Sequence, residues 1–169
     1  MEKVSGIDSV VLLDALDEWL ARGLVRETRD GYDFTHEKVS QVAYEQLARA
    51  RRQWIHGRIA SFLEETAPET DPAKLAQHYY LSNEPGHALP YLVEAGQRAL
   101  AIRSYDEARE FGMRAIGLLG RIPHPGGQRR AERVDLNLLL AQAYAFSGAL
   151  PKALKLLQET EHLAEGLGD

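Results

Sequence analysis

Apolar residues recur at intervals of three and four along most of the 169-residue chain, which is the spacing of one face of an α-helix. Residues 8–23 form the first segment of this kind. Asp8 or Ser9 is placed to cap its start, and Gly23 is suited to end it. The pattern therefore predicts a helix at the beginning of the chain.

The next segment, residues 24–35, alternates apolar and polar side chains instead. Tyr32 and Phe34 share one face of the second of two short runs, and Asp30-Gly31 precedes them as a two-residue turn signal. We expect a β-hairpin here. A helix, a hairpin and a further helix in this order resemble the end of a winged-helix domain.

After the hairpin the pattern predicts one helix after another. The stretches 36–50 and 52–66 each carry one apolar stripe, and prolines and glycines near 67–72, 83–86 and 121–130 separate the helices. The segment 121–130 is the longest expected loop. The two stripes consist of Val39, Val42, Ala43 and Leu47, and of Trp54, Ile55, Ile59, Phe62 and Leu63.

The strongest signal is an internal repeat, in which residues 75–95 match residues 140–160. Ala76 and Ala88 are small enough to let two antiparallel helices approach closely, while Tyr79 and Leu92 fill the space between them. The matched pairs are Leu75 and Leu140, Ala76 and Ala141, Gln77 and Gln142, Tyr79 and Tyr144, Ala88 and Ala153, and Leu92 and Leu157.

A third unit carries Tyr105, Ala108 and Ala115 at corresponding places. Together the units resemble tetratricopeptide repeats over about residues 73–165, although the usual tryptophan is absent and Gly112 stands where a large packing residue is common. The resemblance implies a solenoid of helical hairpins. A generic helical bundle is the alternative.

The order of segments over about residues 8–120 also resembles the region that follows the nucleotide-binding module in STAND-type signalling ATPases, which include maltose-activator-like transcriptional regulators. In that family a P-loop ATPase is followed by a winged helix and then by helical repeats. The repeats act as a sensor and oligomerisation arm. The resemblance implies that this chain is such an arm, with an ATPase domain in cis and ATP or ADP bound by the parent protein.

In the same family a histidine within a Met-His-Asp motif contacts the β-phosphate of ADP. The matching triplet here is Thr35-His36-Glu37, so the resemblance implies that His36 is a phosphate sensor, although Thr35 and Glu37 depart from the motif. A helix start also attracts phosphate through its free N–H groups. The alternative is that Thr35 caps the helix and His36 packs on the hairpin.

The first helices of the repeat units predict a concave face that binds a protein or peptide. A glutamine recurs there in all three units and can both donate and accept hydrogen bonds. The alternative is that these glutamines only cover the groove with polar surface. The predicted partner-binding residues are Gln77, Tyr80, Leu81, Val93, Gln97, Leu100, Leu138, Gln142 and Phe146.

Composition and motifs narrow the classes of function. The net charge of −5 disfavours a nucleic-acid-binding domain, and the absence of cysteine excludes thiolate zinc sites and fits a cytoplasmic protein. "HEKVS" lacks the second histidine of a zincin, and no P-loop motif occurs. No apolar run is long enough to span a membrane. We therefore expect no enzyme, no metal and no cofactor of the chain's own.

The sequence thus predicts a mostly α protein with a partial winged-helix segment at residues 1–48 and tetratricopeptide-like helices at residues 49–169. The predicted function is a non-catalytic interaction arm in signal transduction or transcription regulation, with oligomerisation as one role. A free-standing peptide-binding adaptor is one alternative. The other is a DNA-binding winged helix with a repeat tail, which would use the cluster Arg49, Arg51, Arg52 and Arg58.

Overall fold

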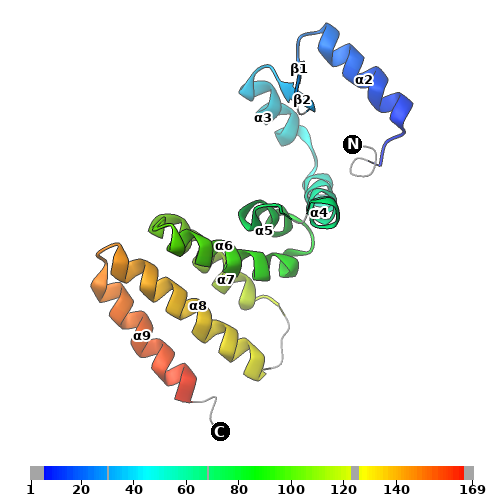
Figure 1. Cartoon of the computed structure of the whole chain (residues 1–169). Coiled ribbons are helices and arrows are strands. Elements are labelled where there is room, and N and C mark those ends of the chain that lie inside the picture. The colour runs from blue at the N-terminus through cyan, green and yellow to red at the C-terminus, as the bar shows by residue number, and fades with distance from the viewer. Residues whose placement is uncertain (1–5, 30, 68, 123–125, 166–169) are drawn as a thin grey trace.

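The structure, a computed structural model, describes residues 6–29, 31–67, 69–122 and 126–165. These residues are mostly helical with one small antiparallel sheet, as the sequence predicts (Figure 1). The elements in chain order are α2 (Ser9–Ala21), β1 (Val25–Thr28), β2 (Gly31–Phe34), α3 (Glu37–Gln46), α4 (Arg49–Thr66), α5 (Pro72–Leu81), η1 (Pro85–His87), α6 (Ala88–Ala101), α7 (Tyr105–Leu119), α8 (Gly126–Phe146) and α9 (Leu150–Glu165).

Both ends of α2 follow from local chemistry. The Asp8 carboxylate accepts a bond from a backbone N–H in the first turn, so Asp8 is the cap. Gly23 adopts a φ of +66°, and the N–H groups of Gly23 and Leu24 bond the carbonyls of Leu20 and Trp19. A left-handed residue at this place satisfies the last carbonyls of the helix. The predicted cap and stop are both confirmed.

The hairpin forms one residue earlier than the turn signal indicates. Val25 pairs with Phe34 and Thr28 pairs with Gly31, so Gly31 is the first residue of β2 and not a turn residue. Asp30 lies outside the described residues. The φ of Gly31 is +137°, a conformation that glycine adopts without strain.

From α4 onward, each helix packs mainly against the next one in sequence. Contacts join α4 to α5, α5 to α6, α6 to α7, α7 to α8 and α8 to α9, and α6 also contacts α8. Figure 1 shows these helices as a stack, with α2, the hairpin and α3 lying apart from α5–α9. One buried cluster runs through the stack and consists of Ala60, Ala76, Tyr79, Ala88, Leu89, Leu92, Ala115, Leu118, Leu119 and Leu136.

Small residues set how closely these helices approach. Ala76 and Ala88 are fully buried, and Tyr79 and Leu92 fill the space beside them, as predicted. At the crossing of α7 and α8, a Cβ added to Gly112 would lie 2.8 Å from Cδ2 of Leu140. Real Cβ atoms essentially never lie this close to another atom, so an alanine here would force the Leu140 side chain to move. This contact explains why Gly112 replaces the large residue of the repeat pattern.

A hydrogen-bonded clasp, formed by Glu64, Tyr79 and Tyr91, joins α4 to α5 and α6. Both tyrosine hydroxyls donate to the Glu64 carboxylate, and the two rings stack with centroids 5.7 Å apart. These bonds lower the pKa of Glu64. Burial, followed by the bond to Glu64, raises the pKa of Tyr79 and of Tyr91 to about 12.

Three expectations fail. No residue of α3 is buried, and Val42 is 52% exposed, because among the described elements α3 has few contacts, mainly with β2. Leu157 is 44% exposed although its repeat equivalent is fully buried, because no described helix covers the outer face of α9. The expected loop at 121–130 is shorter, since α8 already begins at Gly126, and residues 123–125 lie outside the described residues.

The glycine at the α7–α8 crossing generates a stability prediction. We expect Gly112→Ala to lower the free energy of unfolding by about 1–3 kcal/mol, because the added methyl group overpacks Leu140. Gly117→Ala, on the same helix with nothing within 4 Å of its Cβ, should instead raise stability by up to about 1 kcal/mol. Urea unfolding followed by circular dichroism measures both. Equal effects of the two substitutions would contradict the close approach.

The clasp generates a second prediction. Glu64→Gln removes the charge that both tyrosines bond, and we expect a loss of about 1–2 kcal/mol at pH 7, reduced by the exposure of Glu64. Because the folded pKa of Glu64 is lowered, its contribution is complete above the usual value of 4.5 and is lost as the pH falls through the folded pKa. Urea unfolding across this range should therefore show the variant and the wild type converging in acid.

The matched control is Glu65→Gln, which changes an exposed neighbour on the same helix; both glutamates line a cavity of about 380 Å³ next to Tyr79 and Tyr91. Its effect should stay within about 0.5 kcal/mol at every pH. A loss equal to that of Glu64→Gln would mean that general charge around the cavity, and not the tyrosine bonds, stabilises this region.

Candidate functional site

A groove runs between α6 and α8 on the predicted binding face. Two cavities of about 360 and 400 Å³ lie along it. They share Val93 and Gln97 from α6 and Asp135 and Leu136 from α8, so they form one continuous depression. We call this depression the α6–α8 groove.

Helical spacing positions the walls of the groove. On α6, Leu89, Val93, Gln97 and Leu100 follow each other at intervals of three and four, so they project from one side of the helix. The facing wall of α8 presents residues from Glu132 to Gln142. The groove exists because α7 packs between α6 and α8 from one side, while the other side stays open.

The α6–α8 groove is lined by apolar and by acidic side chains. Leu89, Val93 and Leu136 supply apolar surface, and the charged side chains among the described lining residues are all carboxylates. These are Glu94, Glu132 and Asp135. Glu94 already bonds Arg98 at 2.7 Å, and Glu132 accepts a bond from Gln128. Asp135 has no ion-pair or hydrogen-bond partner among the described residues, so its charge faces the groove uncompensated.

The structure brings five of the nine predicted partner-binding residues together. Val93, Gln97, Leu100, Leu138 and Gln142 line one of the two cavities. Whether they bind a partner stays a prediction. Sequence reasoning missed the carboxylates, although Glu132 and Asp135 stand three residues apart on the helix face that carries Leu139 and Gln142, and this spacing was a usable signal.

The other four predicted residues lie elsewhere. Gln77 lines a cavity of about 320 Å³ between α5 and α7, and the Tyr80 ring lies 5.4 Å from the guanidinium of Arg114 on that side. Leu81 ends α5, and Phe146 ends α8, where its ring stacks on Tyr105. The three recurring glutamines therefore do not share one face, because Gln77 lines a cavity with residues of α7, whereas Gln97 and Gln142 line the α6–α8 groove.

His36 is the N-cap residue of α3 and is exposed, and its side chain makes no capping bond. The expectation that Thr35 caps this helix is wrong. The Thr35 hydroxyl donates instead to the carbonyls of Gly23 and Leu24, which ties the hairpin to the end of α2. A phosphate contact by His36 stays a prediction.

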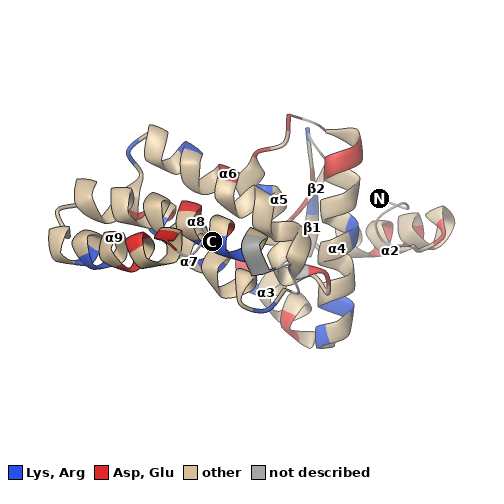
Figure 2. Ribbon diagram, turned by 90° about the horizontal axis from the view of Figure 1, so that it is seen from below, with Lys and Arg blue, Asp and Glu red and all other residues tan. Residues whose placement is uncertain are grey.

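The arginine cluster of α4 is engaged with aromatic rings. The guanidinium of Arg51 lies 4.6 Å and that of Arg58 5.6 Å from the Trp54 ring, and that of Arg52 lies 5.2 Å from the Tyr44 ring. In Figure 2 basic residues colour α4, while α2 carries acidic ones. Such contacts between cations and rings stabilise exposed helices on their own. DNA binding through this cluster, including Arg49, stays a prediction.

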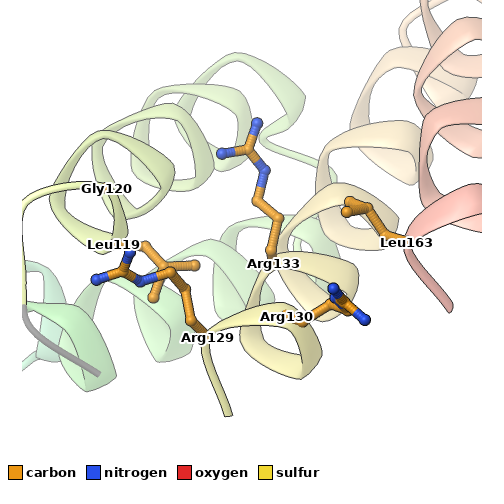
Figure 3. A pocket seen from close by; sticks show the side chains of 6 residues that line it. All are labelled: Leu119, Gly120, Arg129, Arg130, Arg133 and Leu163. Carbon is orange, nitrogen blue, oxygen red and sulfur yellow. The ribbon is translucent and has the colours of Figure 1, made fainter. Parts of the chain in front are cut away.

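A further cavity of about 240 Å³ lies where α8 begins, beside the end of α7. Arg129, Arg130 and Arg133 line it together with Leu119, Gly120 and Leu163. Figure 3 shows the three guanidinium groups pointing in different directions, and Arg129 donates to the carbonyl of Ile122. The charges therefore do not converge on one position that a single anion would occupy.

In the described part of the chain, no group of three or more histidine, aspartate and glutamate residues is placed to hold a metal ion. No helix within the described ranges is long and apolar enough to cross a membrane.

Comparisons with known proteins carry little further information. No family model matches the chain, and no solved structure matches it. Over 97 residues it is 27% identical to a protein of Rhizobium meliloti (strain 1021) that is described as uncharacterized. The match covers 56% of this chain but 9% of that protein, so the chain spans a small part of the length of this relative.

Proposed function

We propose that the chain is a non-catalytic protein-interaction arm, built as a tetratricopeptide-like solenoid, whose α6–α8 groove binds a segment of a partner protein. The observation that carries the proposal is the continuity of the groove, which five of the predicted partner-binding residues line. Packing of each helix against its sequence neighbours supports a solenoid, because such repeats contact only the adjacent unit. The matched repeats at 75–95 and 140–160 support it as well.

The chemistry of the groove selects the partner. Apolar surface from Leu89, Val93 and Leu136 favours apolar side chains, and the uncompensated charge of Asp135 favours a lysine or arginine beside them. We therefore propose a basic amphipathic peptide segment as the ligand. A segment that ends in a free carboxylate is disfavoured, since carboxylates face it from α6 and α8.

We further propose that the arm belongs to a STAND-type signalling ATPase or transcriptional regulator. Three features support this: a helix, hairpin and helix of winged-helix-like order, the repeats that follow, and a relative that is many times longer than the matched region. In such a protein His36 would contact the phosphate of ADP in the adjoining ATPase domain. The arm would then relay the nucleotide state or mediate assembly.

Selection of peptides from a phage-displayed library of 12-residue sequences tests the groove. We expect enriched sequences to combine lysine or arginine with leucine or aromatic residues, since both parts of the groove must be matched. Fluorescence anisotropy with one selected peptide should then show at least about a tenfold weaker affinity for Asp135→Lys and for Val93→Asp, which reverse the charge and remove the apolar contact.

Gln77→Lys is the matched control, because it changes a repeat-equivalent glutamine on the α5–α7 side of the stack. Its affinity should equal that of the wild type. Acidic selected peptides, or binding that Gln77→Lys weakens as much as Asp135→Lys does, would contradict a basic ligand in the α6–α8 groove.

A further inference from the structure

Three polar rings connect the N-terminal part of the chain to the helical stack. The Tyr44 hydroxyl, in the last turn of α3, lies 2.9 Å from Nε2 of His56 on α4. Nδ1 of His56 lies 3.0 Å from Nδ1 of His78 on α5. We call Tyr44, His56 and His78 the ring relay. It spans three consecutive helices at the place where α3 meets the stack.

Apart from the ring relay, little holds α3 against α4. Leu47 and Ala48, the two residues between the helices, are both extended, with ψ values of 133° and 144°. Contacts between α3 and α4 are too sparse to form a packed interface, and Figure 1 shows α3 joined to the stack through this link. The guanidinium of Arg52, which lies over the Tyr44 ring, is a further contact at this place. Hydrogen bonding by the relay is therefore a large part of what orients α3 on α4.

The contact between the two histidines limits how many protons the two rings can carry while the hydrogen bond between them persists. Two ring nitrogens 3.0 Å apart form a hydrogen bond when one of them carries a proton and the other accepts it. With two neutral rings, either histidine can donate to the other. Tyr44 donates to Nε2 of His56 when His56 donates to His78, and accepts from Nε2 when His78 is the donor. One added proton is also tolerated, because a charged His56 donates to both His78 and Tyr44. When both rings are charged, both Nδ1 atoms carry protons, and the bond between them is lost.

The surroundings oppose the doubly charged state. On α3 the titratable group that faces His56 is Tyr44, on α4 the nearby charge is Arg52, and on α5 it is His78 itself. No carboxylate bonds either imidazole among the described residues. Burial lowers the pKa of His56, and burial together with the neighbouring His56 lowers the pKa of His78. Two positive charges would thus repel each other without a counterion.

We propose that the ring relay is a pH-sensitive latch that holds α2, the hairpin and α3 on the stack and releases them when both histidines are protonated. Because both histidines favour the neutral form in the latched state, the contribution of the latch is complete above the usual histidine value of 6.5. It is lost as the pH falls through the lowered values. The latch would change the orientation of the N-terminal unit without unfolding either part.

The test uses the distance between spin labels on the full chain. Because the chain has no cysteine, spin labels attach only at cysteines that are introduced. The exposed positions Asp17→Cys on α2 and Glu161→Cys on α9 place one label on the N-terminal unit and one on the helical stack. Double electron–electron resonance spectroscopy should give one narrow distribution of label-to-label distances at pH 7.5. As the pH falls to 4.5 in buffer with a chelator, we expect the narrow population to be lost and longer distances to appear. An unchanged distribution overturns the proposal.

Substitutions separate the latch from a general acid effect. In the labelled chain, His56→Gln and His78→Gln should each give a distribution that does not depend on pH, since glutamine does not titrate in this range. His162→Gln, an exposed histidine on α9, should keep the response of the wild type. A response to pH that persists in both glutamine variants of the relay overturns the proposal.

Histidine titration by nuclear magnetic resonance decides the matter if a relay variant does not fold. In the wild type, two of the six histidines should titrate below 6.5, each with a curve that the other influences. Independent titration of all histidines near 6.5 overturns the proposal. Because the pKa of Glu64 is lowered from 4.5, the clasp stays charged over most of this range and does not produce the signal.

Discussion

The whole stack depends on the close approach of neighbouring helices at small residues. Ala76 and Ala88 are fully buried between α5 and α6, and Gly112 lies so near Leu140 that an added methyl group would displace the leucine side chain. Each helix buries its apolar stripe mainly against its sequence neighbours, so the separation between helices decides how much apolar surface leaves water. The larger residues Tyr79 and Leu92 then complete the packing.

The groove and the clasp are both consequences of this arrangement. Since α7 packs between α6 and α8 on one side, the opposite side stays open and forms the α6–α8 groove. At the other end of the stack, α4 has one buried residue, Ala60, and so contributes little apolar contact. The Glu64 carboxylate compensates by accepting bonds from tyrosines on α5 and α6. Where the stack begins, the polar clasp therefore takes the place of apolar packing between α4 and the next helices. The ring relay does the same between α3 and α4.

Local chemistry made much of the fold predictable from particular residues. Asp8 and Gly23 end the first helix through backbone bonds that depend on their own side chains and conformations. Ala76, Ala88, Tyr79 and Leu92 could be assigned to the core because small and large residues alternate at helical spacing. For the candidate site, the same periodicity placed Val93, Gln97 and Leu100 on one side of α6, and they do line the groove.

The sequence by itself determined the helices with their apolar faces, the cap and stop of α2 and the presence of a hairpin, because each depends on residues close together in the chain. Only the tertiary structure decided which of those faces are covered. Leu157 occupies the same repeat position as Leu92 but is exposed, since burial depends on whether another helix lies outside α9. Gln77 and Gln97 look equivalent along the chain but belong to opposite sides of the stack. The uncompensated charge of Asp135 and the meeting of His56 with His78 also required the fold, because each depends on groups that distant segments bring near.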